Sequence, residues 1–156
     1  MNQKELDLII TDHALWLADH SKGHQADFGW TDCRGLDFRD ADLRKADFRH
    51  ADLREADLRG ANFRNADFRR ADLRGADCRK ANFLWADLRG ADCHKADFRG
   101  ADCRKADCRE ANFRNADCRK ADLRWTDCRE VDFLWADLRE ADCRWANFRW
   151  ADGLMG

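Results

Sequence analysis

Residues 46–80 read ADFRH ADLRE ADLRG ANFRN ADFRR ADLRG ADCRK, and this stretch decides the fold of the 156-residue chain. It is seven copies of a five-residue unit: Ala, then Asp or Asn, a central Leu, Phe or Cys, then Arg and a variable residue. The unit repeats without a gap from Ala26 to Trp150, which makes 25 units. Repetition at one fixed period indicates an array in which each repeat packs against its neighbours.

Two positions of each unit must point inward. The centres run from Phe28 to Phe148 and comprise 10 Phe, 7 Leu and 8 Cys. The small residue two positions earlier is Ala in 21 units. The other three positions carry nearly all the charge and must face solvent. The four exceptions to Ala are Thr31, Leu36, Thr126 and Val131.

The period of five excludes both an α-helix and a flat strand. An α-helix would advance about 500° per unit, so its apolar residues would spread around the whole surface. A strand alternates with a period of two. A unit that turns the chain by a fixed angle instead stacks each centre over an equivalent centre. The pattern therefore predicts a β-solenoid whose coils are joined by backbone ladders.

The pattern from Ala26 to Trp150 resembles the pentapeptide-repeat family. The resemblance implies an all-β solenoid, a right-handed, four-sided parallel β-helix with four units per coil. One coil would then be 20 residues, and 25 units would give about six coils and a rod about 30 Å long. Gly at a variable position suits a tight corner with positive φ. A charged residue at a mid-rod centre should be severely destabilising.

The chain divides into an N-terminal extension (1–25), the repeats (26–150) and a short tail (151–156). We expect a helix from about Gln3 to Asp19, opened by an Asn2–Glu5 capping box. Because an open solenoid end exposes core and backbone, this helix should cap the first coil. An amphipathic helix that binds a partner or a membrane is the alternative, but the polar face is too acidic for an anionic membrane. The capping face comprises Leu6, Ile9, Ile10, His13, Trp16 and Leu17.

Composition bounds the compartment and the cysteine chemistry. The N-terminus shows neither a signal peptide nor a membrane span, and we expect no membrane partner. All eight Cys are centres, where free Cys acts as a small buried hydrophobe. Unpaired thiols favour a reducing cytoplasm. Cys108 and Cys128 are one coil apart and would stack directly.

The outward positions predict a self-neutralising shell. The residue before the centre is Asp 21 times and Asn four times, and the residue after it is Arg 21 times. Acidic and basic columns should therefore lie side by side, with a net charge of only −2. Nucleic-acid binding needs a net basic face, which the Asp columns disfavour.

The C-terminal third carries apolar residues at outward positions. They suit a protein contact surface, or they stack on neighbouring Arg groups, and both alternatives remain open. Six tail residues cover a coil end poorly, and an open edge invites pairing with another chain. We therefore predict a homodimer through the C-terminal coils. The candidate interaction surface comprises Leu84, Trp85, Trp125, Leu134, Trp135, Trp145 and Trp150.

No residue pattern indicates catalysis, a metal or a cofactor. The Asp columns are exposed and paired with Arg, so a tuned carboxylate pair is not expected. His94 replaces the Arg that usually follows a centre, and it fits a tolerated substitution better than a catalytic base. Cys93, Cys103 and Cys108 face a core and lack the close pairs of a zinc site. There is no phosphate loop or dinucleotide fingerprint.

Two functions from different classes follow. The first is a non-enzymatic structural and protein-interaction module, a rigid rod with an unknown protein partner. The second is implied by the resemblance: some family members resemble B-form DNA in size and charge, bind DNA gyrase or topoisomerase, and protect it from inhibitors. That mimicry needs a strongly acidic surface. Arg after nearly every centre disfavours it here.

Overall fold

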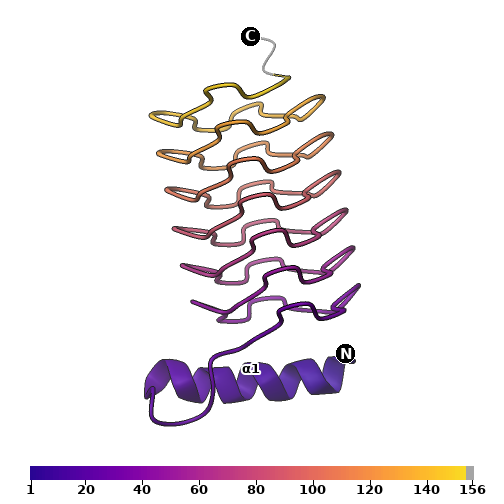
Figure 1. Ribbon diagram of the computed structural model, residues 1–156, viewed down its shortest axis with the longest axis vertical. Coiled ribbons are helices and arrows are strands. Elements are labelled where there is room, and N and C mark those ends of the chain that lie inside the picture. The colour runs from indigo at the N-terminus through magenta and orange to yellow at the C-terminus, as the bar shows by residue number, and fades with distance from the viewer. Residues whose placement is uncertain (154–156) are drawn as a thin grey trace.

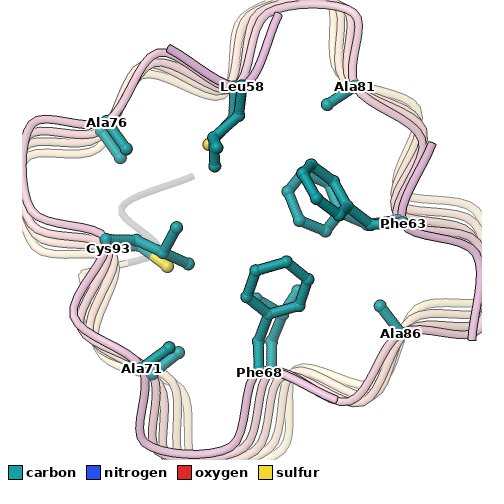
Figure 2. Close-up of a cluster of buried hydrophobic side chains, with 14 of the residues drawn as sticks. Leu58, Phe63, Phe68, Ala71, Ala76, Ala81, Ala86 and Cys93 are labelled. Carbon is teal, nitrogen blue, oxygen red and sulfur yellow. The ribbon is translucent and has the colours of Figure 1, made fainter. Parts of the chain in front are cut away.

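The computed structural model describes residues 1–153 and consists of one helix followed by a stack of coils (Figure 1). Parallel β-bridges join residues 20 positions apart, from Asp27↔Asp47 to Asp132↔Asp152. Each coil is therefore four units long, and Figure 2 shows four sides around a filled centre. The β-solenoid is confirmed; its right-handed sense and the count of about six coils remain predictions. The tail's last residues, 154–156, lie outside the described residues.

The coils are held together by short contacts rather than long strands. Within residues 1–153 each bridge is isolated and involves one Asp or Asn per side. The N–H of Phe98 donates to the carbonyl of Asp117 at 2.7 Å, and the N–H of Gly100 donates to that of Arg119 at 3.0 Å. The Asp N–H of each mid-rod unit donates back to an Ala carbonyl of the coil before.

The remaining two N–H groups of the unit are satisfied within the same coil. The N–H of Ala101 donates to the carbonyl of Phe98 at 3.0 Å and closes a β-turn. The N–H of Arg99 donates to Oδ1 of Asp97 at 3.1 Å. Asn serves equally, because the N–H of Arg64 donates to Oδ1 of its own Asn at 3.2 Å. The position before the centre is therefore always Asp or Asn because the turn needs a short side-chain oxygen there.

Every variable position has positive φ. The angle lies between 56° and 68° at all 25 of them, 20 of which are not glycine. A turn with positive φ at its third residue has type II geometry. The sequence predicts this conformation at Gly60, Gly75, Gly90 and Gly100, where it occurs, but the structure extends it to Trp, Lys and Glu. Ladder bonds on both sides of the turn hold these residues in a conformation that side chains normally avoid.

The core is a column of centres surrounded by Ala (Figure 2). Phe28, Phe48 and Phe68 stack one coil apart with centroids at 4.7 and 4.6 Å. Phe63 meets Phe68 edge to face at 5.1 Å. Towards the C-terminus Cys replaces many rings. Seven of the eight cysteines are buried free thiols, as predicted, and Cys143 is half-buried.

Helix α1 (Gln3–Ala18) lies across the first coil (Figure 1). The predicted capping box of Asn2 and Glu5 is present. Leu6 and His13 are fully buried. On the same face, Ile9 and Ile10 pack against the core, while Trp16 and Leu17 are half-buried.

Polar atoms of α1 complete the open backbone edge of the first coil. The side chain of Gln3 accepts from the N–H of Asp37 and donates to its carbonyl, both at 2.9 Å. The N–H of Ala26 donates to Nδ1 of His13 at 3.0 Å, and the other ring nitrogen lies 3.1 Å from the Arg44 carbonyl. His13 is therefore the neutral Nε2–H tautomer, and burial lowers its pKa. No helix within residues 1–153 is long and apolar enough to cross a membrane.

Removing a buried mid-rod ring should strongly lower the free energy of unfolding. Phe68→Ala leaves a cavity in a fully buried stack, and we expect a loss of about 3–5 kcal/mol. The midpoint of guanidinium unfolding, followed by circular dichroism, measures it. Phe148→Ala is the control, because Phe148 is half-buried and should cost clearly less. Equal losses for the two variants would contradict the difference in burial between the mid-rod ring and the ring of the last coil.

The positive φ at variable positions gives a second test. Gly35 has φ +64°, and nothing lies within 4 Å of where a Cβ would be. Gly35→Ala therefore tests conformation alone and should destabilise by about 1 kcal/mol. Gly35→Asn should cost less, because Asn tolerates this region. An unchanged unfolding midpoint for both variants would show that the turn relaxes.

Candidate interaction surface

The outer shell is a ladder of Asp–Arg pairs. Nε of Arg99 donates to Oδ1 of Asp97 at 2.9 Å, and Nη2 donates to Oδ2 at 2.5 Å. In many units Nε also lies close to the corresponding carboxylate of the next coil, as Nε of Arg119 does at 3.6 Å from Asp137. Each such Arg therefore links its own coil to the next. Hydrogen bonds from the side chain and the backbone N–H of Arg139 lower the pKa of Asp137 to about 2.

One side of the rod shows how substitutions in the ladder compensate each other. His94 and Leu134 replace Arg, so Asp92 and Asp132 each lose the Arg of their own unit. Asn112, in the coil between them, donates through Nδ2 to Asp92 at 3.0 Å. Its freed Arg114 turns to Asp132, with an N–O distance of 3.2 Å. Each carboxylate is paired again, so His94 is part of a rearranged ladder.

Another side carries an interruption that is not compensated. It is formed by units 41–45, 61–65, 81–85, 101–105, 121–125 and 141–145, and we call it the Trp side. Asn62 and Asn82 replace Asp in consecutive coils, and Leu84 replaces Arg. Among the described residues, no carboxylate oxygen lies within 4 Å of a guanidinium nitrogen of Arg64, so this Arg forms no ion pair. The Trp side holds seven basic and four acidic residues, a formal charge of +3 on a chain of −2.

The outward Trp residues are both exposed and stacked. Their exposed fraction runs from 51% at Trp85 to 70% at Trp135 within the candidate set. Trp125 and Trp145 stack with centroids 5.1 Å apart. Nζ of Lys105 lies 4.6 Å from the Trp85 centroid. Cations also cover Trp135 and Trp150, from Arg114 at 5.3 Å and Arg149 at 4.0 Å.

The structure does not gather the candidate residues into one patch. Trp85, Trp125 and Trp145 share the Trp side, with Lys105 between the first two. Three of the other four candidates lie on different sides, because they fall in other columns of the 20-residue coil. Each indole occupies a turn corner with positive φ, from which it projects outward. The remaining candidates are Leu84, half-buried on the Trp side, and Leu134, Trp135 and Trp150 on the other sides.

The surface offers little for chemistry. Its hollows are shallow gaps above glycine corners, such as one of about 400 Å³ beside Gly90, lined by Arg49, Arg69 and Arg70. Within residues 1–153 no three His, Cys, Asp or Glu side chains are arranged to hold a metal ion. Burial raises the pKa of the Cys33 thiol to about 12, so it is a poor nucleophile.

The coil length, the isolated bridges and the Asp–Arg shell define a β-solenoid repeat protein. A family model described as pentapeptide repeats matches in eight copies, in segments 24–60, 51–90, 66–102, 91–127 and 116–152. The chain therefore belongs to the pentapeptide-repeat family, whose known fold is a right-handed quadrilateral β-helix. Proteins of this family are generally non-enzymatic structural or interaction modules.

Solved structures align with this chain. Rfr23, a pentapeptide repeat protein from the cyanobacterium Cyanothece 51142, aligns over 89% of this chain and 99% of its own, with TM-score 0.53 and 20% identity. HetL, from Nostoc sp. strain PCC 7120 and involved in heterocyst differentiation regulation, aligns over 85% and 82%, with TM-score 0.49 and 24% identity. Full-length QnrB1, a plasmid-mediated fluoroquinolone resistance protein, aligns over 79% and 69%, with TM-score 0.41 and 22% identity. Rfr23 shows the shared fold; the other two are too distant to carry an argument. No curated protein matches the chain.

Sequence analysis missed the interruption around Arg64. Its signal was present, because Asn62 and Asn82 are 20 residues apart and Leu84 follows directly. Writing the sequence with one 20-residue coil per row would have placed the two Asn residues next to each other, beside an Arg that lacks an Asp partner. The compensation at Arg114 needs side-chain positions and has no comparable sequence signal.

Acid should weaken the ladder in a defined window. Arg hydrogen bonds lower the pKa of Asp37, Asp137 and Asp142 from 3.8 to about 2. Because the folded-state pKa is depressed, their contribution is complete above about pH 4 and is lost as the pH falls towards 2. We expect the melting temperature to decline across that window.

The acid experiment needs a His13→Gln background. The lowered pKa of His13 means that its protonation favours the unfolded state already below about pH 6.5. In that background, a melting temperature that stays constant from pH 4 to pH 2 would contradict a stabilising ladder.

Proposed function

We propose that this protein is a non-enzymatic interaction module that forms a homodimer through its C-terminal coil and presents its sides to a further protein. The observation that carries the proposal is the difference between the two ends of the rod. The first coil is covered by α1, whereas centres of the last coil are partly exposed. Leu138, Cys143 and Phe148 are half-buried, while the corresponding Phe98, in mid-rod, is 1% exposed.

The backbone at the C-terminal end supports the same proposal. Within residues 1–153, the N–H groups of Leu138, Cys143 and Phe148 have no backbone acceptor. The centres of earlier coils donate at 2.7–3.0 Å to the coil that follows. Unpaired donors beside exposed apolar centres are the features through which open edges pair with other chains. A second copy would present the same edge in a symmetric arrangement, and its carbonyl groups would accept from these donors.

The Trp residues near this end would rim the dimer rather than form its centre. They occupy outward corners, so they surround the exposed centres instead of replacing them. Trp is favoured at protein interfaces, where it buries a large area at little entropic cost. The residues concerned are Trp125, Trp135, Trp145 and Trp150.

DNA mimicry remains the disfavoured alternative. A mimic presents uncompensated negative charge, whereas ladder carboxylates here lie in two-point hydrogen bonds with Arg, as Asp97 does with Arg99. We place the protein in the cytoplasm. The buried thiols, represented by Cys33 and Cys108, suit a reducing compartment.

The mass in solution tests the dimer directly. Light scattering on a reduced sample should give twice the chain mass of 18.2 kDa at high concentration and approach the chain mass on dilution. Cys143 reports the interface, because it is half-buried in one chain and would be covered in the dimer. We expect its alkylation rate to rise on dilution.

Matched variants separate the interface from the fold. Phe148→Asp places a charge on the proposed contact and should give monomers, while Trp85→Asn, far from this end, should leave the dimer intact. Cys33, buried in the first coil, should stay unreactive throughout. A chain that is monomeric at every concentration, with Cys143 always reactive, would refute the dimer.

A further inference from the structure

The fold requires an oxygen before each centre, but it does not require a charge there. Asp97 and Asn62 accept the same N–H bond from the residue after the centre, at 3.1 and 3.2 Å. Replacing Asp by Asn therefore keeps the turn and removes the partner of the following Arg. The four Asn positions mark where the ladder gives up a carboxylate without giving up the coil. They are Asn62, Asn82, Asn112 and Asn147.

Only one of these positions leaves a mid-rod guanidinium without a carboxylate among the described residues. Asn82 is followed by Leu84, so no Arg is stranded there. Arg114 recovers a partner in the next coil, and Arg149 lies over Trp150 at 4.0 Å. A ladder Arg normally faces the Asp of its own unit and the Asp of the next coil. For Arg64 these two positions are Asn62 and Asn82, so both offer an amide instead of a carboxylate. Its side chain is exposed.

The gap in the ladder is bordered by apolar surface. Leu84 is half-buried at the position where the next Arg would lie. Trp85 follows it at the corner and is 51% exposed. Lys105 covers one face of this indole from the coil above, while the corner in the coil below is occupied by the small Asn65. A guanidinium, two amides, an aliphatic side chain and an indole thus lie together on the Trp side.

We infer that this gap is a docking site for an acidic segment of a partner protein. A carboxylate of that segment takes the two-point place beside Arg64 that Asp fills elsewhere in the ladder. An apolar or aromatic side chain close to it packs on Leu84 and Trp85. The inference rests on the proposed interaction function and names the chemistry of one side of the rod. Charge complementarity supports it, since the Trp side is the one with a formal charge of +3.

The same contacts disfavour a nucleic acid as the occupant. Single-stranded nucleic acid binds along a row of cations and stacks bases on open aromatic faces. On the Trp side, Arg104 and Arg124 are held by their own carboxylates. Trp125 and Trp145 stack on each other, and Lys105 covers Trp85. One unpaired guanidinium with an adjoining apolar patch matches a carboxylate beside a hydrophobic side chain.

The experiment fills the gap from within the chain. Asn62→Asp with Asn82→Asp restores the consensus ladder, so the fold should be kept while Arg64 gains two internal carboxylates. Asn112→Asp with Asn147→Asp makes the same chemical change and the same change in net charge at other sides. The probe is fluorescein-labelled poly(Glu,Tyr), which offers carboxylates together with aromatic rings. Binding to the full chain is followed by fluorescence anisotropy at low salt.

We expect the native chain to bind the probe, and the Asn62→Asp/Asn82→Asp chain to bind it about tenfold or more weakly, the order of effect of losing one charge-assisted pair. The Asn112→Asp/Asn147→Asp chain should retain native affinity. Trp85→Asn should also weaken binding, because Asn keeps the corner conformation but removes the indole. Trp135→Asn, on another side, should not.

Three results would overturn the inference. They are no binding by the native chain, equal weakening by both double substitutions, and a preference for single-stranded (dT)20 over poly(Glu,Tyr). The result is independent of the dimer. A Phe148→Asp monomer that still binds the probe would retain the docking site while the proposed self-association fails. A native chain that forms dimers but does not bind the probe would support the proposed self-association and refute the docking site.

Discussion

The structure depends on satisfying all five backbone N–H groups of each unit that has a coil on both sides. Three bond between coils, one closes the turn, and the fifth, on the residue after the centre, is reached only by the side-chain oxygen two positions earlier. Within residues 1–153 this solenoid has no long strands to share this requirement, since its parallel contacts are single-residue bridges. An unpaired buried N–H costs stability, and a unit without this side-chain oxygen would leave one such N–H unpaired. Because the unit repeats, that cost would recur around and along the rod. The invariant Asp or Asn follows from this constraint.

Once the oxygen is fixed by the backbone, the charge on it is free to serve another purpose. In most units the second carboxylate oxygen holds Arg, which couples one coil to the next. Individual exposed ion pairs contribute little, and a continuous ladder contributes through its connectivity. The charge therefore adds cohesion to coils that the backbone already stacks. It follows that an amide at this position alters the surface and leaves the coil intact, which makes its placement informative about binding.

Sequence alone predicts the architecture well, because the period of five admits few structures. The solenoid, the inward centres, the buried cysteines and the capping box of Asn2 and Glu5 follow from pattern and local chemistry. Positive φ was predicted only for glycines, since propensity describes isolated turns and not turns held by ladders on both sides. The polar role of His13 was hidden in an apolar helical face. Partners such as Arg114 and Asp132 join different coils, so their pairing needs side-chain positions.

The two ends of the rod show what the stacking constraint demands where stacking stops. At the first coil, Gln3 offers an acceptor and a donor to Asp37, and Nε2 of His13 donates to the carbonyl of Arg44, so side chains reproduce bonds that a preceding coil would have made. Helix α1 thus works as a cap through polar atoms placed at ladder positions as well as through its apolar face. Any chain that covers the C-terminal coil must meet the same two requirements, with acceptors for the N–H groups of Leu138 and Cys143 and apolar atoms over their side chains. A second copy brings its own apolar centres, but it meets the first requirement only if its carbonyl groups face those donors, which limits the pairing to arrangements with an inter-coil register.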